Sequence, residues 1–187
     1  MRRRSLRLVA GLAVATALVG GCSSKHEAND TLPSASETSA SPEPLGPTDL
    51  PMPAKAREKT ADGFNAFASY YIALINRLDS DLDARYLRQF SRDCETCDRL
   101  ASDAESDAAQ GYSYDGGTIT ITAQAPAHMM EQGAETAFTI NQAAYTVLDK
   151  DGSPVQGLSG EAANDIQGGM AGAWAEDHWI VTNLTFG

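Results

Sequence analysis

The sequence has little positive charge, few cysteines and none of the common catalytic or cofactor motifs. Only 14 of its 187 residues are Lys or Arg, against 25 Asp or Glu, and the formal charge is -11. Because so acidic a surface repels nucleic acid, we expect no nucleic-acid partner. The chain contains no serine-nucleophile motif, no HExxH pair, no phosphate-binding glycine loop and no dinucleotide fingerprint. The sequence therefore indicates no cofactor, no metal and no catalytic residue, and a non-enzymatic protein is the favoured interpretation.

The N-terminal residues have the composition of an export signal. A basic start is followed by an apolar run over 8–19 and then by Gly20 and Gly21. Twelve residues in a helix span about 18 Å, and the hydrocarbon layer is roughly 30 Å thick, so this run is too short for a permanent membrane span. We therefore expect residues 1–21 to be a cleaved signal peptide.

Cys22 follows this run directly. The segment Val19-Gly20-Gly21-Cys22 resembles the lipobox of bacterial lipoproteins, whose commonest form is Leu-Ala-Gly-Cys. The resemblance implies that a diacylglyceryl group is attached to Cys22 and that the chain is cleaved before it. The lipid would then anchor the protein at the extracytoplasmic face of the cell membrane. The alternative is an ordinary secretory signal in which the cysteine falls here by chance.

Residues 22–53 are rich in Ser, Thr, Pro, Ala and Glu and contain almost no large apolar side chain. Such a segment cannot offset the entropy of ordering, so we expect a disordered tether that holds the folded region off the membrane. Loss of residues 1–21 would remove four of the 14 basic residues and no acidic one. The remaining chain would have 10 basic and 25 acidic residues and a formal charge of -15. The remaining residues, 54–187, have the length of one domain.

Apolar spacing predicts three helices after the tether. Apolar residues at three- and four-residue steps indicate an amphipathic helix over 54–78: Phe64, Phe67, Tyr71, Leu74, Ile75 and Leu78. Asp79-Ser80-Asp81 breaks this pattern and is expected to cap a short second helix over 82–90. A third helix is expected to begin at Ser91 or Asp93 and to end at Gly111.

From Tyr112 onward the apolar period changes to two, which is typical of strands. Residues 118–123 alternate cleanly. The apolar phase switches between Ile140 and Tyr145, which predicts a bulge near residues 141–143. A hairpin turn is expected over 149–153, with a further strand from Val155. The last strand pair is expected over 169–175 and 179–186.

This order of elements predicts an α+β domain, with N-terminal helices packed on a curved antiparallel sheet of four to five strands. It resembles the cone-shaped nuclear-transport-factor-2-like fold, with a cystatin-like arrangement as the near alternative. A closer resemblance rests on a set of short motifs: Gly63-Phe64, Tyr70-Tyr71, Asp81-Leu82, Cys94-x-x-Cys97, Tyr112-x-Tyr114 with Gly116-Gly117, and Trp179. These motifs resemble an actinobacterial putative lipoprotein family catalogued as domain of unknown function 6318, over about residues 50–186. That family implies no activity.

Cys94 and Cys97 form the only cysteine pair after Cys22. Outside the cytoplasm such a pair favours a structural disulfide between the second and third helices. A redox-active pair is the first alternative, because a helix start lowers a thiol pKa, but no preceding strand of a βαβ unit is visible. A zinc site is the second alternative, with His128 and His178 as further ligands.

The open end of the predicted cone is the expected place for a ligand. The side chains that could line such a pocket are Tyr70, Tyr71, Tyr112, Tyr114, His128, Trp174 and Trp179. The favoured alternative for the aromatic residues among them is that they simply fill the core. The main hypothesis is a surface-tethered binding domain for a cell-envelope protein, a glycan or a small apolar ligand. An enzyme with His128 or an Asp as base is the alternative, and a purely structural envelope protein is the third.

Overall fold

The structure is a computed structural model that describes residues 44–187. The expected signal peptide over 1–21, Cys22 and the tether up to residue 43 lie outside the described residues. Within residues 44–187, no helix is both long enough and apolar enough to cross a membrane.

The helices are a 3-10 turn η1 (Ala54–Arg57), α1 (Ala61–Asp81), α2 (Arg85–Gln89) and α3 (Glu95–Gln110). The predicted first helix is therefore divided, because the hydroxyl of Thr60 accepts a hydrogen bond from the Gly63 N–H at 3.0 Å and starts α1 afresh. The helix also runs three residues past Leu78 and ends at Leu82 in a left-handed conformation. As predicted, α3 ends at Gly111, which has φ +73°.

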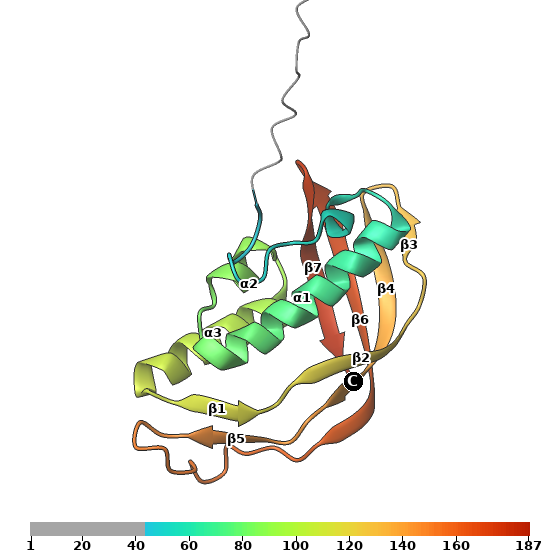
Figure 1. The fold of residues 1–187 in the computed structure, drawn as a ribbon. Helices are drawn as coiled ribbons and strands as arrows, with labels where there is room; N and C mark the ends of the chain where they lie inside the picture. The colour runs from blue at the N-terminus through green and yellow to red at the C-terminus, as the bar shows by residue number, and fades with distance from the viewer. Residues whose placement is uncertain (1–43) are drawn as a thin grey trace, which may run out of the picture. The chain divides into compact units, whose positions relative to one another are not determined.

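Antiparallel strands form the second half of the chain. They are β1 (Ser113–Gly116), β2 (Ile119–Gln124), β3 (His128–Met130), β4 (Gly133–Gln142), β5 (Tyr145–Leu148), β6 (Ala163–Ala175) and β7 (His178–Phe186). The main sheet has the order β2-β4-β6-β7, with β3 beside the start of β4, while β1 and β5 form a separate two-stranded sheet. Figure 1 shows α1 lying across the curved main sheet, so the predicted α+β class with a curved antiparallel sheet is confirmed.

The β1–β5 pair, named the arm here, extends from the main sheet at two backbone breaks. Gly116 and Gly117 separate β1 from β2 and have φ of +89° and +84°. Ala143 and Ala144 separate β4 from β5, next to a register shift between Ile140 and Gln142. The predicted irregularity near residues 141–143 is thus present, and it turns the arm below α1 and α3 in Figure 1.

The turn expected over 149–153 forms, with the Asp149 N–H donating to the Ser153 carbonyl at 2.9 Å. The strand expected from Val155 does not form. Pro154 makes only an isolated bridge with Leu148, and Gly157 turns the chain with φ +84°. Proline cannot donate to a ladder, and although the Val155 N–H donates to the Val147 carbonyl at 2.8 Å, no continuous strand follows. The last two strands form as predicted, although β6 begins six residues earlier, at Ala163.

The half of the core near the start of α1 is filled by aromatic side chains. Phe64 lies 4.9 Å from Trp179, between ring centroids, and Phe67 lies 6.4 Å from Phe90. These four side chains are fully buried. The Trp179 indole N–H donates to the Glu58 carbonyl at 2.9 Å, which satisfies the one polar atom of the ring. This end of the sheet–helix space is a closed core.

The folded region begins before residue 54, where the tether was expected to end. Met52 is buried, and its N–H donates to the Leu45 carbonyl at 2.8 Å. Arg77 of α1 binds Asp49 at 3.1 Å, and the Tyr70 hydroxyl donates to the Leu50 carbonyl at 3.2 Å. Residues 45–52 therefore pack against α1, because contacts with distant residues compensate for their polar local composition.

Candidate functional site

A cavity of about 210 Å³ lies at the opposite end of α1 from the aromatic core, and we name it the Asp79 cavity. Its apolar lining comes from α1, α3 and the residue after α1: Ile75, Leu78, Leu82, Leu100 and Ala104. Its remaining lining residues are Asp79, Asp103, Tyr114, Gly117, Gln142 and Tyr145. An apolar pocket with a few polar groups is the usual form of a small-molecule site.

Asp79 is the ionisable side chain with the most unusual surroundings in this cavity. Within residues 44–187 no cation and no hydrogen-bond donor pairs with its carboxylate, and burial raises its pKa to about 6. Buried carboxylates are normally paired or hydrogen-bonded, because an unpaired charge in an apolar site is costly. The Asp79 carboxylate is thus half-buried, and within residues 44–187 no partner compensates for its partial desolvation.

Two tyrosines of the arm form the wall of the cavity that faces α3. The rings of Tyr114 and Tyr145 lie 6.0 Å apart between centroids. The Tyr114 hydroxyl donates to the Asp107 carboxylate, and burial together with that carboxylate raises the Tyr114 pKa well above its usual range. Tyr114 therefore stays a neutral donor that is committed to Asp107.

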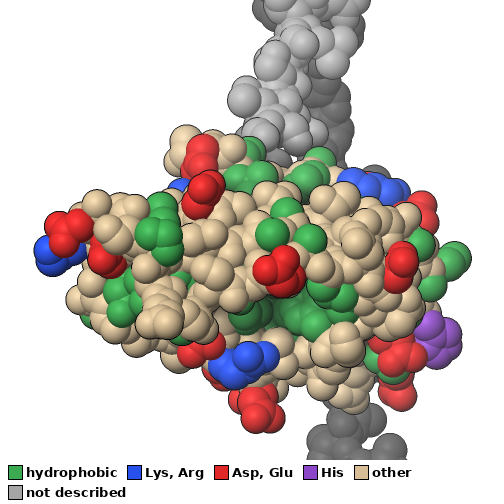
Figure 2. Space-filling model, turned by 90° about the horizontal axis from the view of Figure 1, so that it is seen from below, with side chains coloured by type: hydrophobic (Ala, Val, Ile, Leu, Met, Phe, Trp, Pro, Cys, Tyr) green, Lys and Arg blue, Asp and Glu red, His purple; other side chains and the backbone are tan. Residues whose placement is uncertain are grey.

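A second, more open hollow of about 340 Å³ adjoins the cavity, and we name it the outer hollow. Tyr114, Tyr145 and Asp103 line both spaces. The outer hollow adds Asp107 of α3 and the half-exposed Leu158 of the loop after β5. Figure 2 views the molecule from the side on which the arm lies in Figure 1; hydrophobic side chains form the floor of a depression on this face, and both acidic and basic side chains lie near its edge.

Asn76, one turn before Asp79 on α1, binds the backbone of β2 beside the cavity. The Asn76 side-chain amide donates to the Ile119 carbonyl at 2.9 Å and accepts from the Ile119 N–H at 2.8 Å. These two bonds fix the start of β2 against α1. Gly117 then passes close to Asp79, since a Cβ built on Gly117 would lie 3.7 Å from the Asp79 Oδ2.

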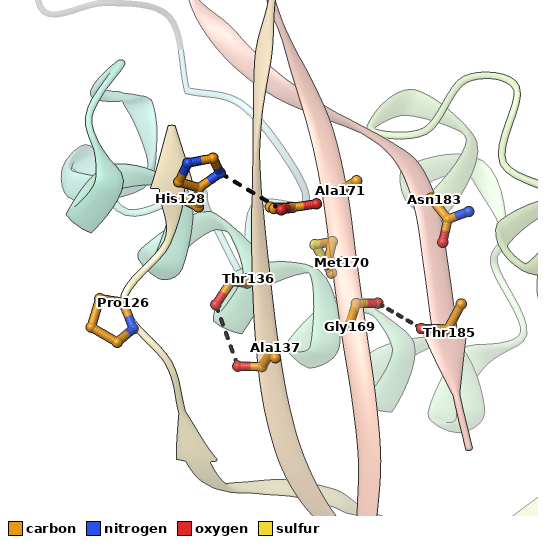
Figure 3. A pocket seen from close by; sticks show the side chains of 10 residues that line it. Pro126, His128, Thr136, Ala137, Gly169, Met170, Ala171, Asn183 and Thr185 are labelled. Atoms are coloured by element: carbon orange, nitrogen blue, oxygen red, sulfur yellow. Dashed lines mark hydrogen bonds and ion pairs between the residues drawn. The ribbon is translucent and has the colours of Figure 1, made fainter. Parts of the chain in front are cut away.

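A wider groove of about 550 Å³ lies elsewhere, over β3, β4, β6 and β7, and Figure 3 shows its lining. His128 lies 3.6 Å from Glu135, and both side chains are mostly exposed. The rest of the lining is small or neutral, with Ala137, Gly169 and Ala171 along the middle. This sheet groove is larger than the Asp79 cavity but is lined by no buried ionisable side chain. The Asp79 cavity is therefore the stronger candidate for a functional site.

The aromatic and histidine residues that we expected around one pocket lie in different places. Tyr114 lines the Asp79 cavity and His128 lines the sheet groove. Tyr71 and Trp179 are fully buried in the aromatic core, and the ring of Trp174 lies 5.0 Å from that of Trp179. Tyr70 also lies in the core, and Tyr112 lines none of the three spaces.

The segment Asp79-Ser80-Asp81 predicts a break after the first helix, whereas the structure places Asp79 in the last turn of α1. A signal for its position was nevertheless present. It follows Tyr71 and Ile75 at steps of four, so it continues the apolar stripe of α1 by one more turn. A carboxylate on the buried stripe of a helix is a recognisable indication of a site.

Cys94 and Cys97 form a disulfide, as expected from the sequence. Both residues are buried, with exposed fractions of 2% and 1%. The bond closes the start of α3, where the Cys94 sulfur also accepts a hydrogen bond from the Cys97 N–H at 3.3 Å. Burial withholds the sulfurs from an attacking thiol, which favours the structural interpretation over the redox one. Within residues 44–187 no three His, Cys, Asp or Glu side chains converge as metal ligands.

A model of a family of unknown function (DUF6318) matches residues 46–185. No curated protein matches the chain. The intermembrane space region of the chloroplast protein ARC6 is similar in structure, with 11% identity and a TM-score of 0.49, over 69% of this chain and 97% of that one.

Two further solved structures are similar in architecture. A nuclear transport factor 2 (NTF2-like) superfamily protein from Salmonella enterica subsp. enterica serovar Typhimurium str. LT2 has 12% identity and a TM-score of 0.39, over 64% of this chain and 92% of that one. A domain of unknown function with a cystatin-like fold from Nostoc punctiforme PCC 73102 has 12% identity and a TM-score of 0.33, over 66% of this chain and 74% of that one. With TM-scores below 0.5, these likenesses carry no argument about function.

Proposed function

Since the chain belongs to the family of unknown function DUF6318, we propose its function from its own residues: it is a lipid-anchored extracytoplasmic protein whose domain binds a small ligand in the Asp79 cavity. One observation carries the binding part of this proposal. The carboxylate of Asp79 lines an apolar cavity without a partner among residues 44–187. A ligand that supplies the partner explains why so costly a side chain is present.

Ligand binding is tested by filling the cavity. Ala104 is buried on α3 and lines the cavity, so an Ala104→Leu substitution places extra carbon atoms inside it. Ala108 lies one turn further on the same helix and is exposed, which makes Ala108→Leu the matched control.

The measurement is amide chemical-shift mapping with a panel of small fragments of positive, neutral and negative charge. We expect some fragments to shift the signals of Leu82, Gly117 and Tyr145 in the wild type and in Ala108→Leu. Ala104→Leu should weaken that binding at least about tenfold. If no fragment of any charge shifts these signals, the cavity is not a ligand site and the proposal fails.

The anchoring part rests on Val19-Gly20-Gly21-Cys22 and the apolar run before it. Its test is expression of the full chain in a bacterium with radiolabelled palmitate. We expect the label in the wild-type protein and its recovery with membranes, and we expect Cys22→Ser to carry no label and to leave the membrane fraction. Cys97→Ser is the control for loss of a cysteine outside the N-terminal segment. A Cys22→Ser protein that still carries label would contradict lipidation at this residue.

An acid–base enzyme is the second candidate, and the pKa of Asp79 near 6 is what favours it, because such a carboxylate suits proton abstraction at neutral pH. The Tyr114 hydroxyl, a candidate acid in the same cavity, already donates to Asp107. Deuterium incorporation separates the two functions. If the protein in D2O exchanges the α-protons of cyclohexanone faster than buffer does, and Asp79→Asn stops it, the enzyme function holds. If the wild-type protein does not accelerate the exchange, or if Asp79→Asn exchanges as fast as the wild type, the binding function stands.

A further inference from the structure

The charges that line the two adjoining spaces have one sign. Asp79 and Asp103 line the Asp79 cavity, and Asp103 and Asp107 line the outer hollow. No Lys, Arg or His is among the residues that line either space. An anionic ligand would therefore meet carboxylates and no cationic side chain here, and a neutral one would leave the Asp79 charge without a counter-charge.

Two basic side chains close in sequence to residues of the lining, Arg77 and Lys150, are engaged elsewhere. Arg77 forms ion pairs with Asp49 and Asp81, and its guanidinium lies 5.4 Å from the centroid of the Tyr86 ring. Lys150, in the turn after the arm, binds the neighbouring Asp151 at 2.8 Å. Within residues 44–187, no Lys, Arg or His lines the Asp79 cavity.

The aromatic wall is also suited to a cation. Tyr114 and Tyr145 present two tilted rings at the boundary of the cavity and the outer hollow. The face of a tyrosine ring attracts an ammonium group within about 6 Å of its centroid. Ile75, Leu78 and Leu100 line the same cavity and provide an apolar surface for the rest of a ligand. Carboxylate, rings and apolar floor together complement a molecule with a charged head and an apolar stem.

We propose that the Asp79 cavity binds an organic cation, a primary amine on an apolar stem, with its ammonium group on the Asp79 carboxylate beside Tyr114 and Tyr145. This inference rests on the proposed binding function and names its ligand class. The acidic outer hollow favours the approach of the cation, because Asp103 and Asp107 make the entrance negative.

The test compares three probes of matched shape and different charge: hexylammonium, hexanol and hexanoate. Affinities are measured at pH 7.5 from the amide shifts of Leu82, Gly117 and Tyr145. We expect hexylammonium to bind at least about tenfold more tightly than hexanol, and hexanoate to bind more weakly than both. Asp79→Asn should reduce the preference for hexylammonium over hexanol to about twofold or less.

The control is Asp115→Asn, which removes the same charge from an exposed position on β1 outside both spaces. It should retain the preference for the amine. Hexanol binding that persists in Asp79→Asn shows that the variant still has its cavity. If the wild type binds hexanol or hexanoate as tightly as the amine, the cation proposal is overturned while the binding function stands. If none of the probes and none of the wider fragment panel enters the cavity, both fail.

Discussion

Asn76 and Ile119 form a reciprocal pair of hydrogen bonds, 2.9 and 2.8 Å long, in which one side-chain amide takes the place of a neighbouring strand for the first residue of β2. The pair joins α1 to the main sheet where the arm departs. It also stands one turn before Asp79, so a single side chain connects the helix, the sheet and the cavity.

Asn76→Ala should therefore lower the free energy of unfolding by about 2–3 kcal/mol, because it removes two hydrogen bonds and leaves two partly buried backbone groups unpaired. Urea denaturation measures the loss. Asn164→Ala is the matched control, since Asn164 is exposed on β6, and it should change stability by less than about 0.5 kcal/mol. Equal effects of the two substitutions would show that the Asn76–Ile119 hydrogen bonds do not stabilise the domain.

Asp79→Asn should stabilise the domain above pH 6. The folded-state pKa of about 6 lies above the ordinary aspartate value of about 4, so the folded protein carries the penalised charge at pH 7.5 and loses it as the pH falls through 6. The groups that face Asp79 from α3 and the arm are Asp103, Tyr114 and Tyr145, and none is cationic.

We expect the Asn variant to be more stable than the wild type by about 1–2 kcal/mol at pH 7.5, which is less than the shift alone implies because the carboxylate is partly exposed to water. The difference should close by about pH 4. Thermal denaturation from pH 4 to 8 measures it, with Asp115→Asn as a control whose difference from wild type stays constant. A pH-independent difference for Asp79→Asn would contradict the burial of its charge.

Gly46→Ala should detach residues 45–52 from α1. Gly46 has φ +88°, and a Cβ there would lie 1.9 Å from the Tyr70 hydroxyl oxygen. Gly157 is the matched control, with φ +84° and no atom within 4 Å of its Cβ position. Both variants bear the backbone cost of alanine at positive φ, but only the first also has the clash. Hydrogen exchange of the Met52 amide should accelerate in Gly46→Ala alone.

The disulfide should resist reduction in the folded protein and should contribute to stability. Replacement of Cys94 and Cys97 together by serine should lower the free energy of unfolding by about 2 kcal/mol, the chain-entropy value for so short a loop. Mass spectrometry after alkylation should find no free thiol when native wild-type protein is treated with a mild reductant, and two thiols once urea is present. Rapid reduction of the native bond would instead support a redox role.

The sequence predicted those parts of the fold that depend on neighbouring residues. The four-residue spacing of Phe67, Tyr71 and Ile75 indicates α1, and the polar turns at 149–153 and 176–177 fix two changes of direction. The strand expected from Val155 does not form, because Pro154 makes only an isolated bridge and Gly157 turns the chain at positive φ.

The cavity and the N-terminal segment depend on contacts between residues far apart in the chain. Asp49 binds Arg77, 28 residues later, and Tyr114 meets Tyr145 only because β1 pairs with β5. Local composition therefore indicated a tether at Asp49, and it could not separate the aromatic side chains that fill the core from those that line a cavity. The structure instead places one of these tyrosines in the closed core and the other at the cavity.

The arm separates the residues that stabilise the protein from those that would select its ligand. Phe64, Phe67 and Trp179 close one end of α1, whereas the loop over 149–162 contributes to the outer hollow through Gly157, Leu158 and Ser159. Insertions or substitutions in that loop would alter the entrance without disturbing the aromatic core. Evolution can therefore vary ligand choice among relatives at little cost in stability, in the way that antibody loops vary on a constant framework.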